Sequence, residues 1–92
     1  MSVVVPFPPS NMSKQQYDSI RGELERTGEW PAEGCQLHVL FGPEDNLRVS
    51  EGWESAEKPQ AFGEKLGPRM EQAGMQLSGE VEVFDVLVFE TF

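Results

Sequence analysis

Hydrophobic and polar residues follow one another in short segments that predict strands and helices in a mixed order. The β-branched residues 3–5 predict a first strand, which Pro6 ends or places at a sheet edge because proline donates no ladder hydrogen bond. A helix is then expected after Ser13, which with Gln16 resembles a capping box. Apolar residues recur along that segment at helical spacing, and Gly28 is predicted to end it.

The middle of the chain predicts a β-hairpin. Residues 35–42 indicate a strand that is apolar on both faces, and residues 47–53 indicate the returning strand. Between them, residues 43–46 have turn chemistry, because proline presets φ and Asp or Asn tolerates the left-handed region.

The second half predicts another helix and a last strand. Ser55 is expected to cap the helix, Gly67–Pro68 to break it into two pieces and Gly74 to end it. Its apolar stripe consists of residues four positions apart, namely Phe62, Leu66 and Met70. The last strand is predicted over residues 81–89, the most hydrophobic segment, and both of its faces are apolar.

This order predicts a single α+β domain over residues 1–92. A β-α-β-β-α-β succession with short connections folds into a ferredoxin-like, four-stranded antiparallel sheet with both helices on one face. Residues 35–42 and 81–89 nevertheless carry apolar side chains on both faces, and a solvated face would alternate with polar residues. We therefore expect a second copy to cover the open face, giving a homodimeric α/β barrel. The alternative is that the chain end folds over its own sheet.

Composition agrees with a globular protein and excludes two classes of partner. Hydrophobic residues make up 38% and charged residues 25% of the 92 residues. Sixteen acidic residues against seven basic ones give a formal charge of −9, which argues against nucleic acid and against anionic membranes. No apolar run reaches the roughly 20 residues that a membrane helix needs, and the first residues do not resemble a signal peptide. We expect a cytoplasmic protein.

The sequence contains one cysteine and one histidine, which limits the chemistry available. Cys35 cannot form an intrachain disulfide, no thiolate cluster can hold zinc, and we expect no metal site. Cys35 is predicted to be a small buried hydrophobe. His38 is the residue that titrates near neutrality without help.

The position of His38 depends on the length of the hairpin loop. With an even number of loop residues, His38 lies opposite Glu51 and shares a face with Trp53. A carboxylate that orients an imidazole beside an indole would make His38 and Glu51 a candidate catalytic pair, with His38 as general base. With an odd number, His38 loses Glu51 and Trp53 moves to the other face. The competing interpretation is a structural histidine satisfied by one local hydrogen bond.

Several of these residues resemble a known superfamily. The run from Leu47 to Ser55, above all Trp53-Glu54-Ser55, is similar to the strand-to-helix segment of the dimeric α/β-barrel superfamily that includes the antibiotic biosynthesis monooxygenases. Phe62, Leu66-Gly67-Pro68 and Gly74 extend the likeness. The chain is most similar to the small uncharacterised members of that superfamily.

The resemblance implies a pocket beside the sheet of each subunit for a flat hydrophobic molecule. We expect Trp53, Tyr17, Phe62 and Met70 to contact this ligand, although each also fits a role in core packing. Members include cofactor-independent oxygenases and haem-degrading enzymes. The latter place a histidine on the second helix where this chain has Phe62-Gly63, so we expect no haem and no other cofactor.

The two functions that remain belong to different classes. One is a homodimer that binds a small hydrophobic or aromatic molecule and acts as a cofactor-independent monooxygenase on polyketide-like or quinol-like substrates. The other is a non-catalytic ligand-binding or interaction module. A cavity of a few hundred Å³ reached by His38 or Trp53 would favour the former.

Overall fold

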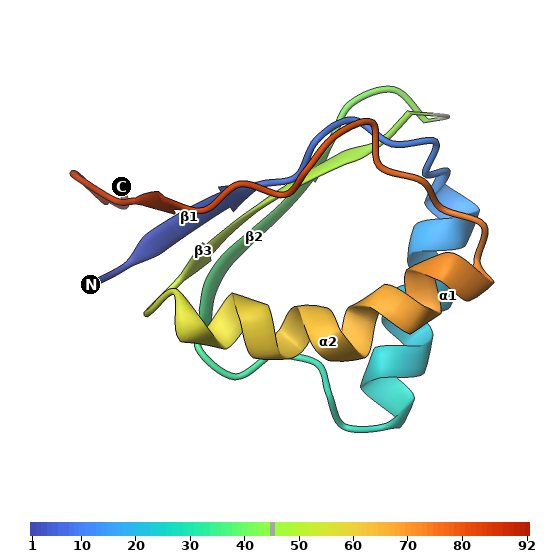
Figure 1. Ribbon diagram of the computed structural model, residues 1–92, viewed down its shortest axis with the longest axis horizontal. Helices are drawn as coiled ribbons and strands as arrows, with labels where there is room; N and C mark the ends of the chain where they lie inside the picture. Colours follow the sequence, from blue (N-terminus) through green and yellow to red (C-terminus); the bar gives the residue numbers. More distant parts are fainter. Residues whose placement is uncertain (45) are drawn as a thin grey trace.

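The computed structural model describes residues 1–44 and 46–92. Its elements are β1 (Val3–Pro6), α1 (Lys14–Arg26), β2 (Cys35–Phe41), β3 (Arg48–Trp53), α2 (Glu57–Gln72) and β4 (Phe84–Asp85). The strands form an antiparallel sheet in the order β2-β3-β1-β4, and both helices lie on one of its faces (Figure 1). The predicted ferredoxin-like α+β fold is confirmed.

The start of α1 has the predicted capping box. The Ser13 hydroxyl accepts a hydrogen bond from the Gln16 amide at 3.2 Å, and the Gln16 side chain accepts one from the Ser13 amide at 2.8 Å. These contacts satisfy two backbone donors that the first turn leaves without helical partners. Gly28, with φ of 80°, follows the helix end as predicted, because this left-handed conformation suits a residue without a Cβ.

The hairpin register follows the even-loop alternative. Phe41 pairs with Arg48, so an even number of residues, six, separates the two strands along the sequence. His38 then pairs with Glu51, as this alternative predicted. The predicted turn includes Asp45, which lies outside the described residues; next to it, the Asn46 amide donates to the Pro43 carbonyl at 3.0 Å.

The hydrophobic core lies between the sheet and the helices. Trp53 is 1% exposed and packs at 5.7 Å between ring centroids against Phe62 of α2. The other buried members of this cluster are Val3, Val5, Leu24 and Ala32. Val3 and Val5 alternate with more exposed neighbours along β1, as expected of a strand with one face against the core.

Two predictions about α2 are wrong. Its N-cap is Ala56 rather than Ser55, and no side chain caps it. Gly67–Pro68 does not break the helix, which runs without interruption from Glu57 to Gln72. Pro68 is exposed, so the carbonyl that loses its helical partner can reach water. The stripe of Phe62, Leu66 and Met70 lies on both sides of the proline along one helix face.

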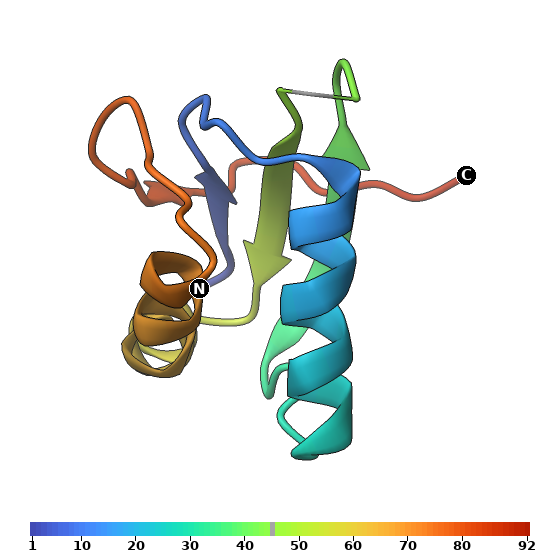
Figure 2. The same ribbon diagram turned by 90° about the vertical axis from the view of Figure 1, so that its right-hand side faces the viewer.

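The last strand is much shorter than residues 81–89. Only Phe84–Asp85 form β4, which pairs with Val3 and Val4 of β1. Beyond it, the chain crosses the face of the sheet opposite the helices (Figure 2), where the Phe89 ring lies 3.9 Å from the position of a Cβ on Gly52. Leu87 stays 94% exposed. Apolar sequence alone did not make a longer strand here, because beyond Asp85 the chain runs across the sheet instead of alongside β1.

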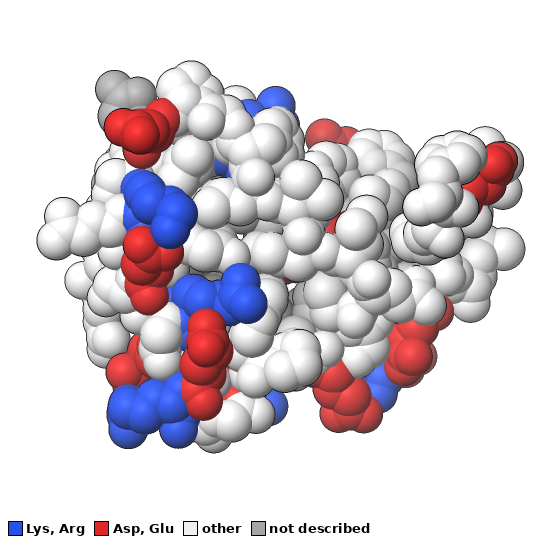
Figure 3. All heavy atoms as spheres, turned by 180° about the vertical axis from the view of Figure 1, so that it is seen from behind, with Lys and Arg blue, Asp and Glu red and all other residues white. Residues whose placement is uncertain are grey.

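The outer face of the sheet is apolar and partly open. Leu37, Val39 and Phe41 of β2 are 43%, 41% and 40% exposed, so the chain end covers this face incompletely. In Figure 3, by contrast, acidic and basic side chains alternate along α1, a mostly acidic group lies at the lower right, and the area between them is largely uncharged. In the described part of the chain, no helix has the length and apolar character needed to cross a membrane.

Candidate functional site

The candidate site is built around the imidazole of His38 on β2. Its Nδ1 atom lies 2.8 Å from Oε2 of Glu51 on β3. The Glu51 side chain is 4% exposed and that of His38 is 18% exposed. The cross-strand register places these two side chains opposite each other on the face that the helices cover.

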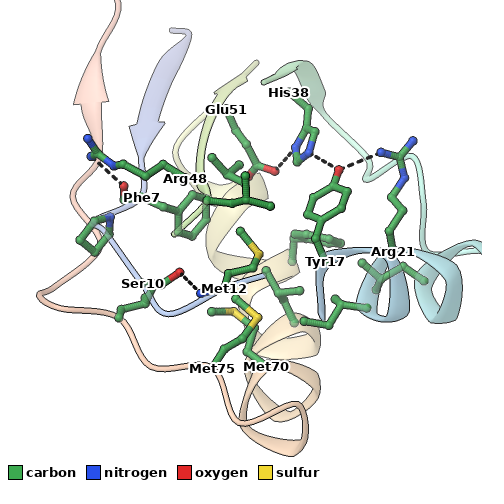
Figure 4. Close-up of a pocket in the computed structure, with 18 of the residues that line it drawn as sticks. Phe7, Ser10, Met12, Tyr17, Arg21, His38, Arg48, Glu51, Met70 and Met75 are labelled. Atoms are coloured by element: carbon green, nitrogen blue, oxygen red, sulfur yellow. Dashed lines mark hydrogen bonds and ion pairs between the residues drawn. The ribbon is translucent and has the colours of Figure 1, made fainter. Parts of the chain in front are cut away.

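Helix α1 adds two further groups to this pair (Figure 4). The Tyr17 hydroxyl lies 2.7 Å from Nε2 of His38, and Nη1 of Arg21 donates to the same hydroxyl at 3.0 Å. Tyr17 and Arg21 are four residues apart, so they lie on one face of the helix, one turn from each other. A continuous hydrogen-bonded chain therefore joins Glu51, His38, Tyr17 and Arg21, which we call the relay.

The chemistry of its two ends sets the direction of the relay. A carboxylate only accepts and a guanidinium only donates. In the neutral imidazole, Nδ1 thus carries the proton that it gives to Glu51, and Nε2 accepts from Tyr17. The phenolic oxygen accepts from Arg21. The three contacts that join the relay are all formed, so a proton can pass from Tyr17 to His38 without any rearrangement of heavy atoms.

Trp30 fixes the geometry of the relay from the side. Its ring meets the imidazole edge-on at 4.8 Å between centroids, and the Arg21 guanidinium lies 4.1 Å above the indole. This cation–π contact, together with an ion pair to Glu25 at 3.1 Å, holds Arg21 in place.

The relay lines a small apolar cavity, which we call the inner pocket (Figure 4). Its volume is about 70 Å³. Its remaining wall is mostly apolar and includes Leu24, Val49 and the three methionines Met12, Met70 and Met75. Methionine side chains are flexible and polarisable, so this wall can adapt to the shape of a ligand.

A larger and more open space, which we call the groove, lies along α2 and is bounded by β1, β3 and the segment before β4. Its volume is about 720 Å³, within the range of roughly 300–1,000 Å³ typical of small-molecule sites. Trp53 lines it, as do Gly63 and Gly67 of α2. The two spaces share part of their walls, including Glu51, Phe62, Leu66, Met70 and Met75.

The predicted site residues divide between these two spaces. Tyr17 and His38 line the inner pocket, Trp53 lines the groove, and Glu51, Phe62 and Met70 line both. Sequence reasoning missed Arg21. The spacing of four residues from Tyr17 was the available signal, since such a pair lies on one helix face.

Cys35 is half-buried rather than fully buried as expected. Its thiol donates to the Leu37 carbonyl, with Sγ and the oxygen 3.4 Å apart. Burial raises the pKa of the Cys35 thiol, and the negative charge of Glu51 raises it further. The thiol is therefore protonated at neutral pH, and Cys35 is a poor nucleophile. Across residues 1–44 and 46–92, no three His, Cys, Asp or Glu side chains come close enough to hold a metal ion.

Comparison with solved structures identifies the fold. A candidate antibiotic biosynthesis monooxygenase from Chloroflexus aurantiacus superposes with a TM-score of 0.61 and 13% identity, covering 98% of this chain and 96% of the other. A protein from Mycobacterium tuberculosis gives 0.56 and 17%, covering 99% and 98%. A candidate antibiotic biosynthesis monooxygenase from Caulobacter crescentus gives 0.55 and 16%, covering 95% and 89%.

The chain has the antibiotic biosynthesis monooxygenase-like fold. The superpositions extend over almost the whole length of both chains, so the likeness is to the complete domain of this fold. No family model matches the sequence, and no curated protein matches it. At these identities the likeness concerns the fold, and the activity has to be argued from the site itself.

Proposed function

We propose that this chain forms a homodimer that binds a hydroxylated aromatic molecule and oxidises it as a cofactor-independent monooxygenase of quinol-like substrates. The observation that carries the proposal is the relay: a buried carboxylate, an imidazole and a phenol in series, at the wall of an apolar pocket. Titratable groups of this kind in a concave apolar site are typical of proton-transfer catalysis.

The relay would act as the general base. A substrate hydroxyl beside Tyr17 passes its proton to the phenolic oxygen as the Tyr17 proton moves to Nε2 of His38. Glu51 stabilises the imidazolium that forms, and Arg21 stabilises negative charge on the phenolic oxygen. Each group already has the required hydrogen bond, so little reorganisation accompanies the proton transfer.

The deprotonated quinol would then supply the electrons that O₂ needs. One quinol and one O₂ give one hydroxyquinone and one water molecule, since the ring gains one oxygen atom and its lost hydrogens form water with the other. Atoms and electrons balance in this reaction without an added reductant. The apolar walls favour a flat ring and exclude water from the carbanion-like anion.

The proposed homodimer is supported by the apolar outer face of the sheet. Val39 and Phe41 are about two-fifths exposed, and the end of the chain covers only part of this surface. A second copy packed sheet to sheet would remove these side chains from water, at about 25 cal/mol for each Å² of apolar surface buried.

The test uses naphthohydroquinone, with O₂ consumption and product identity as readouts. We expect hydroxynaphthoquinone and water from the wild-type protein, whereas uncatalysed oxidation gives naphthoquinone and hydrogen peroxide. His38→Ala is expected to abolish the hydroxylated product without weakening the dimer, because His38 is on the helix-covered face. Unchanged turnover in His38→Ala removes the histidine from the mechanism.

The second candidate function is a non-catalytic ligand-binding module. It is favoured by one observation, namely that both ring nitrogens of His38 already have partners. A module of this kind binds naphthohydroquinone without accelerating its oxidation, so the same experiment separates the two functions.

A further inference from the structure

The inner pocket is small for an organic molecule. Its volume is about 70 Å³, about half the roughly 150 Å³ of an apolar cavity that takes up benzene. An aromatic ring therefore does not fit inside it whole. A water-sized group occupies roughly 30 Å³, so the pocket has room for the substrate hydroxyl at Tyr17 and for one further group of about that size.

The rest of the pocket wall offers such a group few hydrogen bonds. Beyond the relay, its polar side chains among the described residues are Ser10 and Arg48. The Ser10 hydroxyl accepts from the Met12 amide at 3.2 Å (Figure 4). Nη2 of Arg48 donates to the Phe7 carbonyl at 3.1 Å. Because a water molecule needs two to four polar partners, this part of the pocket favours a small apolar molecule over water.

The relay places positive charge at the same wall. Arg21 is a cation, and His38 becomes one when it takes the proton that Tyr17 passes on. The side chains of Arg21 and His38 both line the inner pocket. Negative charge that develops on a small molecule there is stabilised more strongly than in water, because the surroundings are apolar and the cations are already in position. The pocket thus suits a molecule that enters neutral and becomes an anion.

We infer that the inner pocket is the binding site for O₂. This inference rests on the proposed function and gives the position of its second substrate. O₂ is apolar and has two heavy atoms, which matches the wall and the size of the pocket, and it becomes an anion when it takes an electron. No other reactant of the proposed oxidation combines these properties.

The cations at the pocket wall then assist the reduction of O₂. The substrate anion gives one electron to O₂, and the two radicals join through a carbon–oxygen bond at the ring carbon beside the ionised hydroxyl. The outer oxygen of this peroxide takes back the proton held by His38, through Tyr17. The proton on the ring carbon then leaves as the O–O bond breaks, so this carbon becomes a carbonyl, and the released hydroxide and proton form water.

The first test detects O₂ in the pocket without turnover. O₂ is paramagnetic and speeds the relaxation of nuclei beside it, so the methyl groups of ¹³C-labelled methionines show where it resides. Met12 lines the pocket and is 6% exposed, whereas Met1 is 85% exposed and serves as the control. Under O₂ pressure without substrate, we expect a larger gain in relaxation rate at Met12 than at Met1. A gain at Met1 that equals or exceeds the gain at Met12, as freely dissolved O₂ would produce, overturns the inference.

The second test reduces the room for O₂. Val49 lines the inner pocket but not the groove, so Val49→Ile adds one methylene to the pocket alone. We expect the KM for O₂ in the hydroxylation of naphthohydroquinone to rise roughly tenfold, the usual effect of one methylene in an apolar pocket, and the KM for naphthohydroquinone to change much less. Val88→Ile, at an exposed position that lines neither space, is the matched control and should change neither constant. A KM for O₂ that rises no more than the KM for naphthohydroquinone contradicts the O₂ site.

The outcomes distinguish this inference from the function on which it rests. If naphthohydroquinone is hydroxylated but O₂ relaxes Met12 no more than Met1, the proposed function stands and the O₂ site is wrong. If O₂ relaxes Met12 more than Met1 but no hydroxylated product forms, the O₂ site stands and the proposed function is wrong.

Discussion

The hydroxyl of Tyr17 lies 2.7 Å from Nε2 of His38, and this contact joins a helix to the strand beneath it. His38 also bonds Glu51 through Nδ1. Tyr17 is therefore the member of the relay at which a proton can enter, while His38 is enclosed between two partners. We therefore expect Tyr17 and His38 together, and not the imidazole alone, to accept the proton of a substrate.

Replacing Tyr17 by phenylalanine should remove this point of entry and interrupt the relay. The variant keeps the aromatic ring but loses the hydroxyl, so we expect hydroxylation of naphthohydroquinone to fall by roughly 10²–10⁴, the usual contribution of a positioned general base. Steady-state product formation measures this. Thermal unfolding provides the control, since a general loss of structure would lower activity and the melting temperature together.

Glu51 should be more important for folding than its single hydrogen bond suggests. Glu51→Ala leaves a buried imidazole N–H without its partner, at a cost of about 1–3 kcal/mol in the free energy of unfolding. Glu51→Gln retains an acceptor oxygen but no charge, so it should recover most of this stability while turnover stays low. Urea denaturation of both variants gives the comparison. Equal destabilisation in the two would argue against an oriented hydrogen bond.

The sequence allowed the fold to be predicted, and it gave His38 opposite Glu51 as one of two alternatives. The structure has the even loop, and strand alternation then suffices to place His38 opposite Glu51, because cross-strand register repeats every two residues. Tyr17 and Arg21 reach the same point from α1, and that contact depends on how the helix packs on the sheet. No pattern along the chain encodes this packing directly.

The chain end was harder to predict. Hydrophobic residues indicate that a segment is buried, but they do not indicate which surface it packs against. Residues 81–89 read as a strand with two apolar faces, but only Phe84–Asp85 pair. The proline within α2 led to a second wrong prediction, namely that it would break the helix. Its exposed position lets water replace the lost hydrogen bond, so Pro68 stays inside the helix.

The two serines considered as helix caps should differ in stability. Ser13→Ala removes the side-chain acceptor of the capping box and should lower the free energy of unfolding by about 1 kcal/mol. Ser55→Ala should change it by less than roughly 0.5 kcal/mol, because α2 begins after Ala56 with no side-chain cap. Parallel urea titrations test this pair, and similar losses in both variants would mean that Ser55 does cap α2.

Glu29 should make the protein sensitive to acid. The Thr27 hydroxyl, the first of several causes, lowers the pKa of Glu29 below its ordinary value of 4.5, and Arg69 on α2, at 2.5 Å, acts in the same direction. A carboxylate with a lowered folded-state pKa contributes stability above the unfolded pKa and loses it as pH falls through the folded one.

We therefore expect Glu29→Gln to be less stable than wild type at neutral pH and the difference to shrink as pH falls below about 4.5. Chemical denaturation at several pH values measures it. Glu90→Gln, at the exposed chain end, changes net charge equally and serves as the control. A difference that stays constant down to strongly acidic pH would show that the Glu29 charge does not contribute.

The outer face of the sheet gives the prediction on which the dimer depends. Val39 is at the centre of the exposed β2 residues Leu37, Val39 and Phe41, so Val39→Lys would bury an unpaired ammonium in a sheet-to-sheet interface, which is strongly unfavourable. Analytical ultracentrifugation should show a dimer for the wild-type chain and a monomer for Val39→Lys. Gln15→Lys introduces the same side chain at an exposed position on α1 and should leave the dimer intact. A wild-type protein that sediments as a monomer at micromolar concentration would contradict the homodimer. The outer face of the sheet would then be covered by the chain end alone.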